Sequence, residues 1–400
     1  MLDSLEVIGI AILIGFIAGR FIVKIKIPAV AGYVIIGVVL GQSVLNIFHE
    51  TMLEQVGVIS DIALGFIAFI IGGELRWHHL RQLGKSIAFI VILESLGAFF
   101  LVTTLIQVFF HNWPLALVLG AVSAATAPAA TVMVIREMKA DGIFTRTLLS
   151  VVAIDDGIGL ILYVIASSIS RTIISNNITF SVKAIAFSAL ADIGSAIAIG
   201  LLAGFLIAPA VRRFHRTENI LVVTIGALFI ITGLADQLNI SALLTNMAFG
   251  IYMTNFCPIS SRKVFTVVKD VTPPIFIAFF VTAGAHLYIK LISKIWFMGL
   301  IYLLARIAGK IIGASIGANM AKANENIRKY IGFGLVSQVG VAIGLALVVG
   351  REFTPLGLTG KYIAQVTINL LLATTIFTEI IGPIMTRFAL IKTGEAYKLK

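Results

Sequence analysis

Two adjacent carboxylates, Asp155 and Asp156, lie in the middle of a run that is otherwise as apolar as a membrane span, LLSVVAIDDGIGLILYVIA. A charge at the centre of a bilayer costs about 2.5–3.5 kcal/mol on insertion scales, so these side chains must pair, line water or face the protein interior. Adjacent residues on a helix point about 100° apart, so one carboxylate can meet a cation while the other faces a cavity. Carboxylate oxygens bind a hard cation or take a proton, and two close carboxylates titrate as a coupled group. The pair predicts a site where protons are exchanged for a hard cation.

Two basic residues, Arg306 and Lys310, lie one helical turn apart inside another apolar run, WFMGLIYLLARIAGKIIGASIGA. Lys310 can pair with one of the two aspartates, either within the exchange site or as a static ion pair that only holds helices together. One lysine would leave the second carboxylate without a structural role, which favours the exchange site. For Arg306 we expect a structural ion pair with Glu94 in FIVILESLGAFF, and we also expect Glu379 to be structural.

Pro128 interrupts a third apolar run, GAVSAATAPAATVMV. Proline lacks an N–H and clashes with the carbonyl four residues earlier, here that of Ala124, so the helix should break or kink. Three hydroxyl residues, Ser123, Thr126 and Thr131, flank this position. Their side chains can bond back to their own helix. Alternatively, Thr126 and the freed carbonyls help to coordinate the ion, because half-helix ends carry partial charges.

A second irregular span, GFGLVSQVGVAIGLALVV, has Ser337, Gln338, Gly340 and Gly344 near its middle. These residues weaken a helix less decisively than a proline does. Gln338 is a further candidate neighbour of the ion site. The two irregular spans are the fifth and the twelfth expected, and this odd offset inverts their orientation. Spans one to six and eight to thirteen can therefore form an inverted-topology repeat, in which the two broken helices mark the binding site.

The composition requires an integral membrane protein. Of the 400 residues, 59% are hydrophobic and only 12% are charged, and the mean hydropathy is +1.05. A helix needs about 20 mostly apolar residues to cross the hydrocarbon core, and such segments follow one another almost from end to end. They predict an all-α polytopic membrane protein with about thirteen transmembrane helices. The spans are expected at residues 4–24, 29–47, 53–74, 85–110, 114–137, 143–173, 181–212, 218–236, 240–256, 264–290, 294–320, 327–350 and 360–391.

Basic residues separate the two ends of these spans. The connections at one end, with the C-terminal tail, hold 22 Lys and Arg, and those at the other end hold 6. The positive-inside rule then places the N-terminus outside and the C-terminus in the cytoplasm. The net charge of +11 reflects this topology, so no nucleic-acid site is expected.

Other chemistries find little support. The single Cys257 excludes an internal disulfide and a cysteine-based metal site, and the six His residues have no ligand spacing. No constellation of nucleophile and base is visible. We therefore expect neither an enzyme nor a bound cofactor.

Three motifs together resemble a known family. TAPAATVMVIREMKADG, VVAIDDGIGL one span later and RIAGKIIGASIGA in the eleventh span are similar to the sodium/proton antiporters of the second cation:proton antiporter family, most closely its NapA-like branch. The likeness covers nearly the whole chain and includes KIPAVAGYVIIGVVLG in the second span. Where related proteins often have an acid in the twelfth span, this chain has Gln338.

The resemblance implies roles for the charged residues. Asp156 would be the carboxylate that binds Na+, with Asp155 beside it at the same ion site and paired with Lys310. Thr126 would lie at the crossing of the broken helices. Ser123, Thr131 and Gln338 remain candidate neighbours of the ion.

The resemblance also implies an NhaA/NapA-like fold and a homodimer in the cytoplasmic membrane. A dimer domain would contact the second copy, and a core domain would move against it. The expected dimer domain comprises residues 1–74 and 218–290, the core residues 85–173 and 294–391, and the linker helix residues 181–212.

The function expected from all this is secondary antiport of Na+ (or Li+) against H+. We expect two protons for each Na+, because one-for-one exchange at Asp156 moves no net charge; Asp155 and Lys310 are the candidates for the second proton. One alternative is K+/H+ exchange, which the aspartate pair disfavours. Another is a cation channel whose intramembrane charges are only structural.

Overall fold

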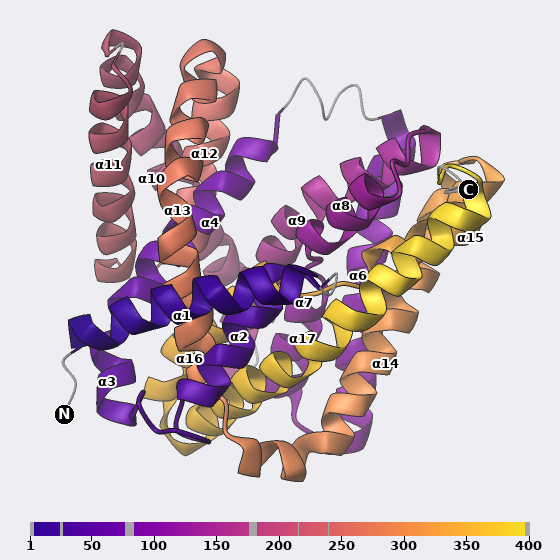
Figure 1. Cartoon of the computed structure of the whole chain (residues 1–400), viewed down its shortest axis with the longest axis horizontal. Helices are drawn as coiled ribbons and strands as arrows, with labels where there is room; N and C mark the ends of the chain where they lie inside the picture. The colour runs from indigo at the N-terminus through magenta and orange to yellow at the C-terminus, as the bar shows by residue number, and fades with distance from the viewer. Residues whose placement is uncertain are drawn as a thin grey trace. The chain divides into compact units, whose positions relative to one another are not determined.

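The computed structural model describes residues 4–24, 27–76, 84–175, 182–214, 216–238 and 240–396. Within these ranges the regular elements are helices, without a strand (Figure 1). Ten helical segments are long and apolar enough to span a membrane, which confirms an all-helical, multi-pass membrane protein. Ten is fewer than thirteen because two expected spans form helices of 12 and 15 residues, and two others overlap the single apolar stretch Gly340–Thr393.

The described helices form two compact units. The first contains all the candidate site residues. It consists of α1 (Ser4–Lys24), α2 (Ala29–Leu40), most of α3 (Glu50–Gln55), α6 (Gly84–Phe110), α7 (Trp113–Ser123), α8 (Pro128–Glu137), α9 (Ile143–Ile174), α14 (Ile289–Met320), α15 (Glu325–Tyr330), η1 (Ile331–Leu335), α16 (Gly340–Phe353), η2 (Thr354–Leu356) and α17 (Gly357–Thr393). The second consists of α4 (Gly57–Glu74), α10 (Val182–Arg213), α11 (Thr217–Gln237), α12 (Ala242–Phe256) and most of α13 (Pro258–Ala285).

A stripe of glycines brings α14 into close contact with α6. A Cβ added to Gly309 would lie only 2.6 Å from the carbonyl oxygen of Gly97, and one added to Gly313 would lie 2.8 Å from the Cα of Glu94. Gly317 continues the stripe one turn further, against Phe89. Small residues at this spacing allow two backbones to approach closely. This contact places the side of α14 that carries Lys310 against the side of α6 that carries Glu94.

Two segments of the first unit are interrupted. α7 ends at Ser123, and α8 begins with Pro128 at its first turn, where a missing N–H costs no helical hydrogen bond. Residues 124–127 between them are outside both helices. In the other segment, η1 ends at Leu335 and α16 begins at Gly340. We call residues 124–127 the first break and residues 336–339 the second break.

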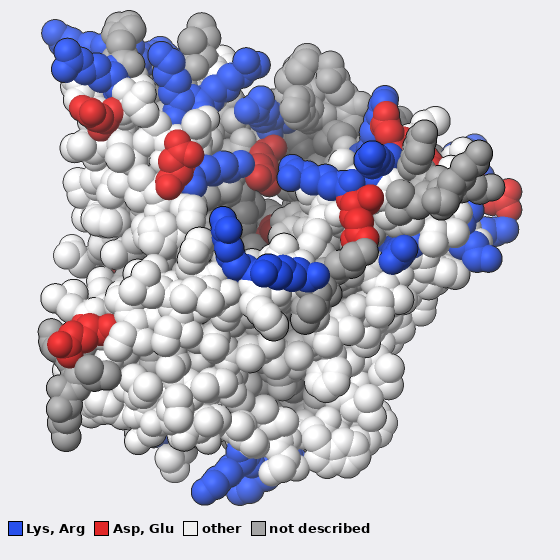
Figure 2. All heavy atoms as spheres, in the orientation of Figure 1, with Lys and Arg blue, Asp and Glu red and all other residues white. Residues whose placement is uncertain are grey.

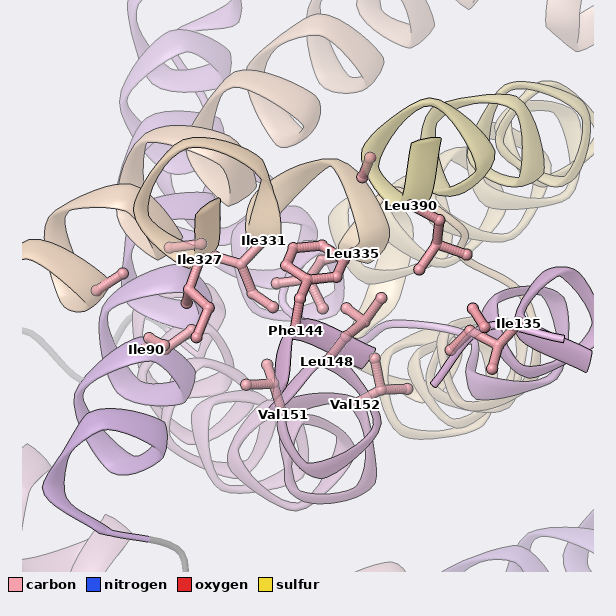
Figure 3. Packing of buried hydrophobic residues seen from close by; sticks show 14 of the residues in the cluster. Ile90, Ile135, Phe144, Leu148, Val151, Val152, Ile327, Ile331, Leu335 and Leu390 are labelled. Atoms are coloured by element: carbon pink, nitrogen blue, oxygen red, sulfur yellow. The ribbon is translucent and has the colours of Figure 1, made fainter. Parts of the chain in front are cut away.

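An apolar cluster holds the helices on one side of these breaks (Figure 3). Leu148 and Val152 on α9 precede the aspartate pair by one to two turns, and they pack in this cluster with Leu335, the residue before the second break. The other labelled members are Ile90 of α6, Ile135 of α8, Phe144 and Val151 of α9, Ile327 of α15, Ile331 of η1 and Leu390 of α17. The cluster therefore fixes α9 and η1 against one another next to the site.

In the second unit, α4 and α12 pack at close range. A Cβ on Gly250 or on Gly72 would collide with a carbonyl of the opposite helix. Phe69 on α4 stacks on Phe265 of α13 with ring centroids 4.8 Å apart. Small residues and aromatic rings thus build a core separate from that of the first unit.

Large apolar side chains cover much of the outer surface. Phe205 and Leu206 on α10 are 62% and 63% exposed, and Leu304 on α14 is 58% exposed. On the face drawn in Figure 2, uncharged residues dominate and the charged side chains are gathered in groups. Such a surface is suited to contact with lipid.

Candidate ion-exchange site

Lys310 on α14 contacts two carboxylates at once. Its Nζ lies 2.6 Å from Oε2 of Glu94 on α6 and 3.1 Å from Oδ2 of Asp155 on α9. All three side chains are fully buried. Two acids share one ammonium group, so this is a buried triad and not an isolated ion pair.

The same ammonium group reaches the first break. Nζ of Lys310 donates to Oγ1 of Thr126 at 2.9 Å and also to the carbonyl oxygen of Ala124. Such carbonyls lack an intrahelical partner because the helix has ended. Lys310 therefore joins the acids of α6 and α9 to the end of α7.

Ser95 connects the two acids of the triad. Its Oγ lies 3.0 Å from Oε1 of Glu94 and 3.0 Å from Oδ1 of Asp155. The side chain next to Glu94 thus also positions Asp155, and both contacts are buried. Sequence reasoning missed Ser95, because the sequence does not show which helix packs against the glycine stripe of α14.

Asp156 lies next to the triad on α9 and is 5% exposed. One turn further along α9, a Cβ on Gly159 would lie 3.4 Å from the backbone nitrogen of Ala125 in the first break. α9 therefore passes close to the break just beyond the aspartate pair. The structure brings together Asp155, Lys310 and Thr126 and places Asp156 beside them.

Arg306 has a different role from the one expected. Its guanidinium group donates to the carbonyl oxygens of Ser123 (3.1 Å) at the end of α7 and Ala125 (2.9 Å) in the first break, and to those of Val336 and Ser337 (3.3 Å) in the second. The expected ion pair with Glu94 is not formed, since Lys310 takes that carboxylate. The freed carbonyls carry partial negative charge, so a planar cation with several donors can bind them together.

Gln338 connects the second break to its neighbours. Its Nε2 donates to the carbonyl oxygen of Val122 on α7 at 2.9 Å, and Oε1 accepts from the hydroxyl group of Tyr302 on α14 at 3.1 Å. Tyr302 is another residue that the sequence did not single out. In this structure the amide is committed to these contacts and does not reach Lys310.

The remaining hydroxyl residues differ in their partners. Ser123 donates to the carbonyl of Gly120 in its own helix at 2.6 Å, as in the local alternative. Thr131 instead donates across to the carbonyl of Gly334 at 3.0 Å, and the N–H of Ala127 donates to the carbonyl of Ser337 at 2.9 Å. The two interrupted segments therefore bind directly to each other at their breaks.

A helical membrane protein with broken helices around buried carboxylates and a lysine has the architecture of a secondary transporter. The chain belongs to the sodium/hydrogen exchanger transmembrane family, whose profile matches residues 9–392. This match confirms the family indicated by the sequence motifs.

Characterised relatives are similar over almost their whole length. The Na(+)/H(+) antiporter of Enterococcus hirae is 27% identical over 384 residues, which cover 93% of this chain and 96% of the relative. The Na(+)/H(+)-K(+) antiporter GerN of Bacillus cereus is 26% identical over 395 residues, with coverage of 96% and 95%. Both names are those of cation/proton antiporters.

The fold is shared with a solved structure. The sodium proton antiporter MjNhaP1 from Methanocaldococcus jannaschii, solved at pH 8, superposes with a TM-score of 0.81 at 18% identity. The match covers 97% of this chain and 98% of that structure. The architecture is therefore that of a known antiporter fold.

Proposed function

We propose that this protein exchanges Na+ (or Li+) for H+ across the cytoplasmic membrane. The observation that carries the proposal is the buried triad, in which Lys310 holds Asp155 while the adjacent Asp156 keeps a small exposed fraction of 5%. A carboxylate in this position can bind either a cation or a proton, but not both. Occupancy of Asp156 by one ion then excludes the other, and this competition couples the two fluxes.

The transport cycle that we propose is of the elevator type. A core would carry Asp156 from one side of the membrane to the other against a dimer domain that contacts a second copy of the chain. The division of the described helices into two compact units supports two bodies. The assignment of residues 1–74 to the dimer domain rests on the family resemblance, since α1 and α2 belong to the first unit in this structure.

The membrane topology is part of the proposal. We propose thirteen spans, with α2, α12, α16 and α17 each crossing as a separate segment, and two crossing broken helices related by an inverted repeat. The contacts between the two breaks support the crossing. The distribution of Lys and Arg, 22 against 6, supports an outside N-terminus and a cytoplasmic C-terminus.

We further propose that the exchange is electrogenic, with two protons for one Na+. One proton for one Na+ at Asp156 moves no net charge, so a current requires a second proton-carrying group. The sign of the current tests this ratio, since a two-for-one exchange carries net positive charge in the direction of the protons.

The exchange is tested with the full chain in proteoliposomes that contain a pH-sensitive dye. Addition of Na+ or Li+ should change the internal pH, and the rate should saturate and be inhibited competitively by protons. Vesicles without protein are the control. A protein that produces no Na+-dependent or Li+-dependent pH change would contradict the proposal.

K+/H+ exchange is a second candidate, favoured by the similarity to a relative named a Na(+)/H(+)-K(+) antiporter. The same vesicles distinguish the cations when each chloride salt is added separately. A cation channel is the other alternative. It would conduct without competition between Na+ and H+.

A further inference from the structure

Glu379 is a buried acid on α17. Its side chain is 0% exposed, and neither carboxyl oxygen has a donor among the described residues. Buried polar groups in native proteins are nearly always paired, so an exception of this kind requires an explanation. An ionisable residue inside a membrane segment is by default a functional candidate.

The surroundings of Glu379 are polar. On the same stripe of α17, the hydroxyl groups of Thr375 and Thr386 are also buried without a partner in the described part of the chain. The hydroxyl group of Ser337 likewise has no partner among the described residues, and a Cβ on Gly382 would collide with it. Since Gly382 is one turn from Glu379, the stripe reaches the second break.

Arg306 brings a positive charge to this stripe, since its guanidinium group donates to the carbonyl oxygen of Ser337, whose hydroxyl group lies against Gly382. The guanidinium nitrogens are nevertheless engaged by carbonyl oxygens at both breaks. The attraction therefore acts without a hydrogen bond. Arg306 can stabilise an ionised Glu379, but without a hydrogen bond it leaves both the protonated and the ionised form of this carboxyl group accessible.

The charges of the core do not balance with one ion. In the described part of the chain four acids and two bases are buried there: Glu94, Asp155, Asp156, Glu379, Arg306 and Lys310. Fully ionised, they would carry two negative charges in excess, so a neutral core without Na+ holds two protons. Glu94 and Asp155 share Lys310, so Asp156 and Glu379 are the acids to which these two protons belong.

We propose that Glu379 is the second proton-carrying group of the exchange, an inference that rests on the proposed antiport. Na+ replaces the proton of Asp156, and the second proton leaves Glu379 in the same half-cycle. The O–H bond of the Glu379 carboxyl group then breaks, and the proton passes to water on the side to which the core is open. The carboxylate that remains faces Arg306. When Na+ leaves, Glu379 takes a proton again.

The decisive measurement is the balance point of the gradients in proteoliposomes at zero membrane potential. For a tenfold proton gradient, net flux should stop at about a hundredfold Na+ gradient if two protons move, and at about a tenfold gradient if one moves. We expect the wild type to balance at the hundredfold Na+ gradient and to give a transport current on a solid-supported membrane. Glu379→Gln should retain Na+/H+ exchange, balance at the tenfold Na+ gradient and give no current.

Glu352→Gln is the matched control. Glu352 on α16 accepts hydrogen bonds from Tyr163 (3.1 Å) and Ser167 (2.7 Å), away from the breaks. This variant should keep the current and the hundredfold balance. Should Glu379→Gln not fold, Glu379→Met tests the same point, since an apolar side chain suits a site without hydrogen-bond partners.

A measurement of proton release tests the same proposal without a variant. The purified wild type, titrated with Na+ in weak buffer, should release about two protons for each ion bound. The inference is wrong if only one proton is released, if the wild type is electroneutral, or if the Glu379 variants keep the current. An absence of any exchange by the wild type would instead refute the proposed function.

Discussion

Lys310 lies closer to Glu94 than to Asp155, with Nζ distances of 2.6 and 3.1 Å to the nearest oxygens. An ammonium group with two carboxylate partners can strengthen one contact when the other is weakened. Asp155 can therefore respond to an ion at Asp156 while Lys310 stays paired. This relationship makes Glu94 part of the site, although α6 carries none of the sequence motifs of the family.

The first prediction is that Glu94→Gln lowers stability and slows exchange without abolishing it. A charged hydrogen bond is lost, which costs about 1.5–3 kcal/mol. Asp155 then remains as the carboxylate partner of Lys310. The melting temperature should fall, and the apparent KM for Na+ should rise as Asp155 is held more firmly. Glu325→Gln, at a side chain that is 72% exposed, should change neither value. An unchanged KM would show that Glu94 is only structural.

The second prediction is that Asp156→Asn abolishes exchange. The amide cannot take up and release a proton, and it offers the cation one neutral oxygen in place of a carboxylate. The pH-dye signal on addition of Na+ should equal that of vesicles without protein. Asp141→Asn is the control, because Asp141 forms an exposed ion pair with Arg146 at 3.2 Å. Robust Na+-dependent flux in Asp156→Asn would refute the assignment.

The sequence could predict the features that depend on local chemistry. The interruption at Pro128 follows from a missing N–H, and the presence of Lys310 near an aspartate follows from the cost of a charge in the bilayer. It could not predict which base meets Glu94. Arg306 and Lys310 are one turn apart on the same side of α14, so the choice depends on the rotation and closeness of two packed helices. Such tertiary geometry depends on which helix packs against the glycine stripe, and the sequence of α14 does not show this.

The third prediction concerns Thr126, whose Oγ1 accepts a hydrogen bond from Lys310 at 2.9 Å. Thr126→Val removes this acceptor and keeps the side-chain shape. We expect a higher apparent KM for Na+, because Lys310 is less firmly tied to the break and competes for Asp155. The protein should remain folded. Measurement of the initial rate against Na+ concentration checks this.

The control for Thr126 is Thr367→Val on α17, where the hydroxyl group is buried without a partner in the described structure. Loss of an unsatisfied hydroxyl group should leave transport unchanged and leave stability equal or higher. If Thr126→Val changes only the melting temperature, the residue contributes to helix packing and not to the ion site.

The last prediction is that Gly313→Ala disrupts the site through the backbone. A Cβ there would collide with the carbonyl of Leu93 and lie 2.8 Å from the Cα of Glu94, so α6 and α14 must separate. Overpacking of this kind costs about 1–3 kcal/mol, and it moves Lys310 away from Glu94. Gly299→Ala on the same helix is the matched control, since its Cβ would meet only a Thr374 methyl group at 3.9 Å. That change should stabilise α14 by about 0.5–1 kcal/mol. We expect the melting temperature and the Na+ flux to fall together in Gly313→Ala but not in Gly299→Ala. If the two variants behave alike, the close approach of α6 and α14 does not position Lys310.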